Sequence, residues 1–349
     1  MYILVINCGS TSTKMGLFED ETMICEHTER YDIDSLPETM EGDLSMRRQS
    51  VKKFLESCPV GEQDLSCIAC RGGAFYPVHG GAYVVNQELV SALKETSKNN
   101  PDNYSGIIGF SLSQELSIPA YIYDAVTVDE LKPIARYSGV KGADRYSRTH
   151  TLNTRAMAIA AAKELGRDYL DMNIITAHLG GGVSVNVYEH GRLSDLVTSE
   201  EGGFSAERCG GLAGDTVLEL FKTRGYEEVE RLFHGKGGLV SYFDSNDALV
   251  VEEKIKGGDQ EAEAIFEAMA YQVAKSIGAM AVAVGGKVDL IVLTGGIMRS
   301  ERLQKWISER VSFLAPVVVK AGEMELQALA GGALRVMRHE EEARIYCKN

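Results

Sequence analysis

The sequence lacks four features that would place it in a special class of protein. Its seven cysteines are scattered and odd in number, which excludes a disulfide framework and predicts a reducing, cytoplasmic location. Basic residues are not in excess: 36 Lys and Arg against 50 Asp and Glu give a net charge of -14, which argues against nucleic acid or an anionic membrane as a partner. The most apolar stretch, 268–284, is interrupted by Gln272, Lys275 and Ser276, so no membrane span is expected. The first residues lack the basic segment of a signal peptide.

What remains is an ordinary globular composition in a chain that is long for one domain. Hydrophobic residues make up 44% and charged residues 25%, as in folded proteins generally. The 349 residues are enough for two domains with separate cores, and we expect the break near residue 149. Strand and helix patterns follow one another in both halves, which predicts an α/β fold.

The N-terminal residues predict a strand, a polar turn and a second strand. Residues 2–6 are a short apolar run rich in β-branched side chains, and residues 15–18 resume the strand pattern. The turn between them holds groups that donate to phosphate oxygens, namely Asn7, Ser10, Thr11, Ser12, Thr13 and Lys14. A P-loop is rejected, because its second glycine is missing and a strand follows where a helix is required. A serine-rich hairpin with a solvated lysine is an equally good alternative.

The same unit recurs at residues 174–188, where His178 lies near the end of the first strand and Gly180-Gly181-Gly182 form the turn. Three residues without Cβ atoms let successive backbone N–H groups converge on an anion. A second glycine-rich loop, 200–215, contains Arg208, and an arginine buried among glycines has room to bind an oxyanion with both arms. Alone, a glycine triplet is more often a tight turn, but the recurrence of the unit favours phosphate binding.

Two polar residues end predicted strands. Arg71 follows the strand at 65–70, a position that projects side chains into a cleft in open α/β sheets. Asp124 ends the strand at 120–124 and is either a metal ligand or a helix N-cap.

Two further positions lie beside predicted helices. His150 precedes the helix at 153–165, where a histidine is usually a surface or capping residue. Gly295, Gly296 and Ile297 follow a buried strand at 288–293, and such glycines let a nucleotide approach the backbone.

In combination, these pieces resemble the short-chain carboxylate kinases of the acetate and sugar kinase, Hsp70 and actin superfamily, with the butyrate kinases as the most similar branch. The resemblance runs the length of the chain. The matching segments are Val5-Ile6-Asn7-x-Gly9-Ser10-Thr11-Ser12-x-Lys14, Arg71-Gly72-Gly73, His79-Gly80-Gly81, Asp124, His150, His178-Leu179-Gly180-Gly181-Gly182, Phe204-Ser205-Ala206-Glu207-Arg208-Cys209-Gly210-Gly211-Leu212, Thr294-Gly295-Gly296-Ile297 and Glu325-x4-Ala330.

The resemblance implies a duplicated two-lobe actin-like ATPase fold with the active site in the interlobe cleft. The expected lobes are 1–149, rejoined by a C-terminal helix at 326–349, and 150–325. It further implies at least a homodimer, formed through the second lobe.

The resemblance also implies a reaction: reversible, in-line transfer of a phosphoryl group from ATP to butyrate or a branched C4 or C5 acid, giving ADP and an acyl phosphate, with Mg²⁺ required. Acetate or propionate kinase activity is the alternative within this class. A non-enzymatic actin-like or Hsp70-like nucleotide switch is the alternative outside it.

Site roles carry over by the same resemblance. Arg71 and Arg208 would clamp the carboxylate and the phosphoryl group, His150 would hydrogen-bond that group, and Asp124 and Glu325 would hold Mg²⁺. Phosphate and nucleotide binding would fall to Asn7, Ser10, Ser12, Lys14, His178, Gly180, Gly181, Gly182, Gly295, Gly296 and Ile297.

Three positions depart from the pattern of the related enzymes. Asn99 stands where they usually have a histidine, and Thr149 where they usually have a phenylalanine. Gly73 replaces a valine of the acetate-specific enzymes. Because Gly73 and Thr149 are small, we expect a substrate pocket with room for longer acids.

Overall fold

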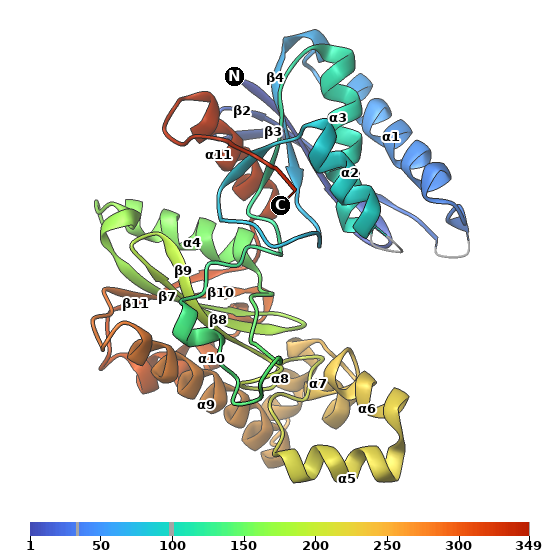
Figure 1. Cartoon of the computed structure of the whole chain (residues 1–349). Coiled ribbons are helices and arrows are strands. Elements are labelled where there is room, and N and C mark those ends of the chain that lie inside the picture. Colours follow the sequence, from blue (N-terminus) through green and yellow to red (C-terminus); the bar gives the residue numbers. More distant parts are fainter. Residues whose placement is uncertain (33–34, 98–100, 349) are drawn as a thin grey trace. The chain divides into compact units, whose positions relative to one another are not determined.

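The computed structural model describes residues 1–32, 35–97 and 101–348, so Asn99 lies outside the described residues. The chain divides into two compact units (Figure 1). Unit 1 comprises Met1–Asp129 and Met324–Asn349, and unit 2 comprises Glu130–Glu323. Each unit is described by itself.

The division at Asp129 falls earlier in the chain than the expected break at residue 149. Residues 130–149 lie with unit 2 because their polar groups find partners there. The Lys132 N–H donates to Ser194 O at 2.9 Å, and the Arg145 guanidinium donates to Leu196 O at 2.6 Å.

Unit 1 contains a seven-stranded sheet in the order β12-β5-β6-β4-β1-β2-β3. The strands are β1 (Tyr2–Cys8), β2 (Ser12–Glu19), β3 (Thr22–Arg30), β4 (Leu65–Arg71), β5 (Ala82–Val84), β6 (Ala120–Tyr123) and β12 (Arg344–Ile345). β1 lies in the interior of the sheet, antiparallel to β2 and parallel to the central strand β4. Its apolar run is buried on both faces, as a continuous rather than alternating pattern predicts.

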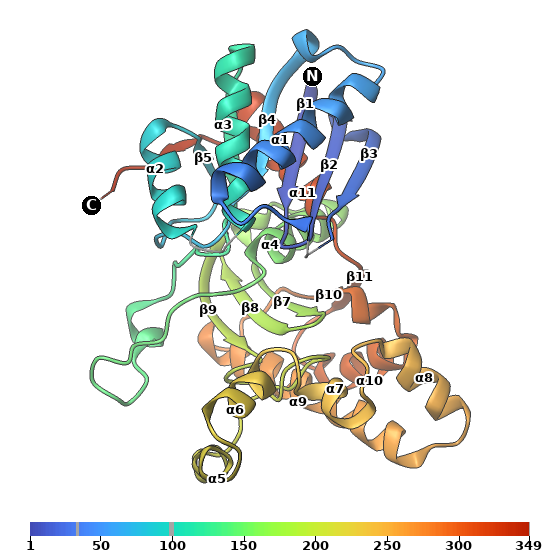
Figure 2. The ribbon, with the colours of Figure 1, turned by 90° about the vertical axis from the view of Figure 1, so that its right-hand side faces the viewer.

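Helices cover both faces of this sheet. Those of unit 1 are α1 (Met40–Ser57), α2 (Gln87–Thr96), α3 (Tyr104–Leu116) and α11 (Glu325–Met337), with 3₁₀ turns η2 (Glu62–Asp64) and η3 (Pro101–Asn103). Thr39 and Asn86 cap α1 and α2 by accepting backbone N–H groups. Figure 2 shows α1 and α3 on one face and α11 on the other, so the last helix of the chain packs on the sheet formed by its first residues.

Unit 2 repeats this plan with a five-stranded sheet in the order β11-β10-β7-β8-β9. The strands are β7 (Asn173–Leu179), β8 (Val183–Glu189), β9 (Arg192–Thr198), β10 (Leu290–Gly295) and β11 (Val317–Ala321). β7, β8 and β9 form an antiparallel meander, and β10 and β11 add to β7 in parallel. β1, β2, β3 and β4 are arranged in the same way, so the predicted duplication of a strand-turn-strand unit is confirmed.

The helices of unit 2 bury a second core. They are α4 (Thr151–Glu164), α5 (Gly214–Arg224), α6 (Tyr226–Phe233), α7 (Gly238–Phe243), α8 (Ala248–Lys256), α9 (Gln260–Ala283) and α10 (Glu301–Val311), with η4 (Pro133–Arg136), η5 (Tyr169–Asp171) and η6 (Gly296–Arg299). α4 covers one face of the sheet and α9 the other (Figure 1). Phe266, Met269, Val273 and Ile277 of α9 are fully buried in this core. No helix in the described part of the chain is both long and apolar enough to cross a membrane.

Candidate active site

In unit 1, strand register brings four of the predicted residues together. β1 and β4 are parallel neighbours, so Asn7 and Arg71 at their carboxyl ends lie side by side, and Lys14 on β2 pairs directly with Asn7. Arg71 donates to Asn7 Oδ1 at 3.3 Å, and Asn7 Nδ2 donates to Glu325 Oε2 at 2.7 Å. Glu325 is the first residue of α11. A cluster of two cations, an amide and a carboxylate therefore forms at the end of the sheet.

The ion pairs of this cluster are long. Lys14 Nζ lies 3.8 Å from Glu325 Oε2, and the Arg71 guanidinium lies 3.9 Å from the nearest carboxylate oxygens of Glu325 and Asp102. These separations exceed hydrogen-bond length, so the carboxylates attract the Lys14 and Arg71 side chains without a direct hydrogen bond. Arg71 is 24% exposed, which places it at the surface of unit 1 where an oxyanion can reach it.

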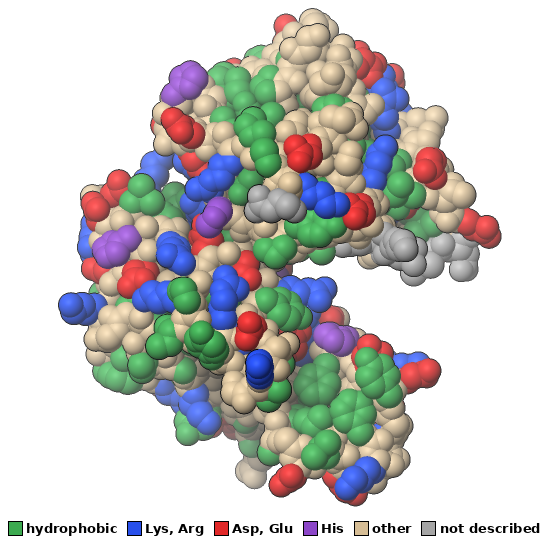
Figure 3. Space-filling view, viewed as in Figure 1, with side chains coloured by type: hydrophobic (Ala, Val, Ile, Leu, Met, Phe, Trp, Pro, Cys, Tyr) green, Lys and Arg blue, Asp and Glu red, His purple; other side chains and the backbone are tan. Residues whose placement is uncertain are grey.

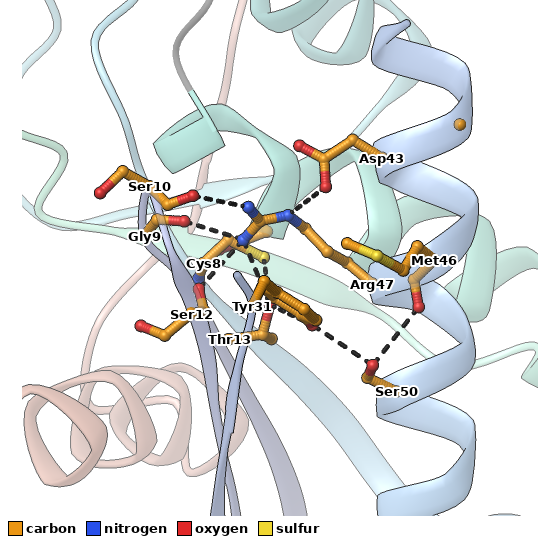
Figure 4. A network of polar contacts seen from close by, with 12 residues as sticks. Cys8, Gly9, Ser10, Ser12, Thr13, Tyr31, Asp43, Met46, Arg47 and Ser50 are labelled. Atoms are coloured by element: carbon orange, nitrogen blue, oxygen red, sulfur yellow. Dashed lines mark hydrogen bonds and ion pairs between the residues drawn. The ribbon is translucent and has the colours of Figure 1, made fainter. Parts of the chain in front are cut away.

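The turn between β1 and β2 is held by a residue that the sequence analysis did not single out. Arg47 of α1 is fully buried and binds the turn through the carbonyl oxygens of Gly9, Ser10 and Ser12 (Figure 4). Its one sequence signal was Asp43 four residues before Arg47, the spacing of a helical ion pair.

In unit 2, the two glycine-rich loops meet. Glu207 N–H donates to Gly181 O at 3.1 Å, and the Ser205 hydroxyl donates to the same oxygen at 2.6 Å. A Cβ built on Gly181 would lie 3.0 Å from a Glu207 carboxylate oxygen, and one on Gly182 would lie 2.9 Å from Arg208 NH1. The turn adopts no left-handed backbone, so a side chain at Gly181 or Gly182 would be resisted mainly by the mobile ends of Glu207 and Arg208.

Arg208 is not buried, contrary to the expectation for an arginine among glycines. Its side chain is 33% exposed, and NH1 lies 3.7 Å from Glu200 Oε1. Its guanidinium lies against Gly182, and the exposed part of the side chain is accessible to an anion from solvent.

Two histidines stack beside this turn. The rings of His150 and His178 have centroids 4.2 Å apart and an interplanar angle of 23°. His150 is the N-cap of α4 but makes no capping bond with its side chain, and its Nδ1 instead lies 3.0 Å from the Ser184 hydroxyl. The Asn153 amide donates to His178 Nδ1 at 2.9 Å, so the proton of a neutral His178 lies on Nε2.

Burial keeps His178 neutral. Its ring is 2% exposed, and desolvation lowers its pKa to about 4. Glu323 Oε1 lies 3.6 Å from Nε2, but this carboxylate is half-exposed to water, so burial outweighs its attraction. His178 is therefore an uncharged N–H donor at neutral pH.

A cavity of about 720 Å³ opens in unit 2 beside the glycine turn, within the size range of small-ligand sites. Four of the predicted nucleotide-binding residues line it: Gly180, Gly181, Gly296 and Ile297. Sequence reasoning missed the rest of the wall, which comes from α8, η6 and the residues around them. These are Glu207, Asn246, Asp247, Ala248, Leu249, Glu252, Lys256, Arg299, Ser300, Glu301, Arg302 and Glu323.

A sequence model of the acetokinase family matches residues 78–320, well over half of the chain. The chain belongs to the acetokinase family. Solved structures agree on the fold. The acetate kinase of Porphyromonas gingivalis is 19% identical, with a TM-score of 0.81 over 96% of this chain and 99% of that one. The propionate kinase of Francisella tularensis is also 19% identical, with a TM-score of 0.73 over 95% and 98%.

The fold extends to sugar kinases. The ROK hexokinase of Thermus thermophilus is 14% identical, with a TM-score of 0.52 over 98% of this chain and 100% of that one. The expected actin-like ATPase fold is therefore confirmed. Membership of the acetokinase family also supports an ATP-dependent phosphotransferase acting on a carboxylate.

Enzymes of the acetokinase family typically use Mg²⁺, and the acidic residues of unit 1 are partly suited to bind it. No group of three or more His, Cys, Asp or Glu side chains suited to a metal occurs among the residues described. Mg²⁺ bound with a nucleotide needs only one or two carboxylates, since phosphates and waters supply the other ligands. Glu325 is partly exposed within the cation cluster, so its chemistry is compatible with being one such carboxylate.

Asp124 is placed differently from Glu325. It is 2% exposed, its backbone is left-handed with φ 42°, and its Oδ1 accepts the Gly81 N–H at 2.7 Å. Asp124 thus holds the turn at Gly81, and a strained backbone of this kind is often found at functional sites. Its role toward Mg²⁺ stays a prediction.

The prediction that the small Gly73 leaves room for a longer acid was wrong. A Cβ on Gly73 would lie 2.1 Å from Asn103 Oδ1 and 2.7 Å from the Asn103 backbone nitrogen. Gly73 is therefore a glycine because η3 approaches it closely, and it leaves no empty space for a longer acid. Thr149 is buried as well, and its hydroxyl donates to Asn186 Oδ1 at 2.9 Å.

Proposed function

We propose that this acetokinase transfers the γ-phosphoryl group of ATP to a short aliphatic carboxylate, giving ADP and an acyl phosphate. The observation that carries the proposal is the cluster of Asn7, Lys14, Arg71 and Glu325 in a chain of this family. The cluster places two cations and an amide together at the end of the unit 1 sheet. Such a cluster suits substrates whose reacting groups are all oxyanions.

The chemistry asks little of the protein beyond position and charge. A carboxylate is already ionised at neutral pH, so it attacks phosphorus without a general base. Arg71 and Arg208 would neutralise oxygens of the carboxylate and of the moving phosphoryl group, and His150 would donate to that group. Mg²⁺, when bound with the nucleotide, supplies further neutralisation of the phosphate oxygens, and Glu325 and Asp124 are the residues proposed to hold it.

Nucleotide binding is assigned to unit 2. The cavity beside Gly180 and Gly181 lies in the size range of small-ligand sites, and the walls near Ile297 and Leu249 offer apolar contact to the base. The neutral Nε2–H of His178, together with the backbone of the glycine turn, would donate to phosphate oxygens.

The preferred acid is proposed to be butyrate or a branched C4 or C5 acid. Support comes from the motif Glu207-Arg208-x-Gly210-Gly211-Leu212 and the glycine triplet, which resemble the butyrate branch. Acetate or propionate is the alternative, and the relatives of known structure named above act on those two acids.

The deciding experiment traps the product. Purified protein is incubated with Mg-ATP, hydroxylamine and each straight or branched acid from C2 to C6, and the hydroxamate formed from the acyl phosphate is measured. We expect hydroxamate only when acid and ATP are both present, with the highest kcat/KM at C4. A best rate with acetate would replace the butyrate assignment, and nucleotide binding without any hydroxamate would support the switch alternative.

We also propose a homodimer formed through unit 2. α5 has no buried residue, and α6 buries only Val229. Hydrophobic side chains gather over these two helices in Figure 3, and Leu218, Tyr226 and Tyr242 are each at least 60% exposed. An apolar face of this kind is typical of a protein–protein contact. Light scattering after size exclusion will give the mass of the protein in solution and so test for the dimer.

A further inference from the structure

Arg47 is a fully buried cation with no direct place in the proposed chemistry. It is the largest fully buried side chain in the described part of the chain. Burying a guanidinium is expensive unless it is paired and its donors are hydrogen-bonded. The partners that Arg47 has acquired therefore indicate what the charge is for.

Those partners lie almost entirely in the turn between β1 and β2. Nε donates to Asp43 Oδ1 at 2.6 Å on the same helix. NH1 donates to Gly9 O at 2.8 Å and to Ser12 O at 3.0 Å, and NH2 donates to Ser10 O at 2.9 Å. The ring of Tyr31 flanks the guanidinium, with its centroid 4.8 Å from Cζ (Figure 4).

The result is a turn in which each of four successive carbonyl oxygens has a hydrogen-bond donor. Arg47 binds the oxygens of Gly9, Ser10 and Ser12, and the Tyr31 N–H binds that of Thr11 at 2.9 Å. Figure 4 shows the hydroxyls of Ser10 and Ser12 on the side away from Arg47. A carbonyl oxygen turned toward a phosphate would repel it, so this arrangement leaves the donor groups of the turn for the anion.

We propose that Arg47 is a positioning residue that fixes the carbonyl groups of Gly9, Ser10 and Ser12 toward α1, so that the turn offers mainly donors to a phosphate group. The proposal rests on the proposed function in one respect, that the turn binds a phosphate of the substrates. Arg47 itself contacts no substrate.

Lysine cannot replace Arg47 in this role. The contacts use donors on all three guanidinium nitrogens, spread over a rigid plane, whereas lysine offers three donors from one atom. Arg47→Lys keeps the positive charge beside Asp43 but cannot hydrogen-bond the three carbonyl oxygens at the same time. Arg48→Lys is the matched control, because Arg48 is the next residue of α1 and its side chain pairs with Glu115 at the surface.

The first readout is amide hydrogen exchange in the free protein. The N–H groups of Gly9 and Tyr31 donate to Ser12 O and Thr11 O, so their protection reports the orientation of the turn. We expect Arg47→Lys to speed exchange at these two amides at least ~10-fold while β4 and α3 keep their rates. Arg48→Lys should change neither amide.

The second readout is the kinase reaction. We expect Arg47→Lys to lower kcat ~30-fold or more while KM for the acid changes less than ~3-fold, since a misplaced turn affects phosphate positioning. Thr13→Val serves if Arg47→Lys does not fold: it removes one acceptor of NH1, at 3.4 Å, and should give smaller changes in the same direction.

The proposal is overturned if amide exchange at Gly9 and Tyr31 is unchanged in both Arg47→Lys and Thr13→Val. It is also overturned if these variants exchange faster throughout unit 1 while kcat is unchanged. Exchange needs no activity, so its outcome is separate from the proposed function. A wild-type protein that forms no acyl phosphate refutes the kinase assignment, while the exchange data still decide how Arg47 acts on the turn.

Discussion

The buried ring of His178 stacks on His150 and receives the Asn153 amide at Nδ1. This arrangement suits only the neutral imidazole, because a protonated ring has no acceptor nitrogen to offer Asn153. The pair thus contains one histidine whose charge state is fixed by the fold.

The first prediction is that His178 makes stability depend on pH. Burial lowers its folded-state pKa to about 4, from an unfolded value of 6.5. Above pH 6.5 both states are neutral and the native state keeps its full stability. As pH falls from 6.5 to 4, only the unfolded state takes up the proton, so up to roughly 3 kcal/mol of stability is lost.

The measurement compares wild type with His178→Gln in urea unfolding between pH 7.5 and 4. Glutamine does not titrate and can accept the Asn153 amide, so the difference between the two proteins isolates this ring. We expect the wild type to lose stability relative to the variant over that range. A constant difference would show that the pKa of His178 is the same in the folded and unfolded states, so that burial does not lower it.

The second prediction concerns Arg71 and Arg208. Both are partly exposed, and the ion pairs that they make with the described residues are 3.7 to 3.9 Å long, so these pairs contribute little to stability. Alanine at either position should therefore leave Tm within a few degrees and lower kcat/KM by ~10²-fold or more. Arg224→Ala is the control, because Arg224, at the end of α5, is a surface residue paired with Glu228 of α6. A variant of Arg71 or Arg208 that keeps more than about a tenth of the activity has no such role.

The parts of the site that the sequence predicts are those set by strand ends. Asn7 and Arg71 each follow an apolar run, and parallel pairing of β1 with β4 brings such positions together in any open sheet. The glycine turn after β7 was recognisable for the same reason. Local pattern and a general rule of topology were sufficient here.

The parts that were missed depend on contacts between distant segments. Arg47 binds carbonyl oxygens, which every residue has, so no side-chain pattern in the turn reveals the partner. Gly73 is explained by the approach of η3, thirty residues later in the chain, and its own neighbours give no sign of it. The cavity wall on α8 likewise follows from helix packing.

The third prediction is that Gly73 matters to stability and not to acid preference. Gly73→Ala places a Cβ where Asn103 already lies, so we expect a loss of about 2 kcal/mol or more, typical of overpacking. Gly278→Ala is the control, because a Cβ there meets nothing within 4 Å and alanine favours a helix. If Gly73→Ala is as stable as wild type and shifts the preferred acid from C4 toward C2, the pocket does extend to this residue.

The last prediction compares two adjacent glycines, one of which is constrained by the fold while the other faces the open space of the cavity. Gly295 has φ 99°, and a Cβ there would lie 2.2 Å from Leu179 O, so its constraint comes from the fold. Gly296 meets nothing within 4 Å and lines the cavity. Gly295→Ala should therefore lose about 2 kcal/mol or more of unfolding free energy.

Gly296→Val, in contrast, should leave Tm within a few degrees and place its side chain in the cavity. If adenosine binds there, KM for ATP rises at least ~10-fold, while KM for the acid changes little because the acid is assigned to the cluster of unit 1. Direct binding of ADP by calorimetry checks the same point without turnover. An unaltered ADP affinity in a well-folded Gly296→Val protein means that the nucleotide lies elsewhere, and the assignment of the cavity then fails even if the kinase reaction is confirmed.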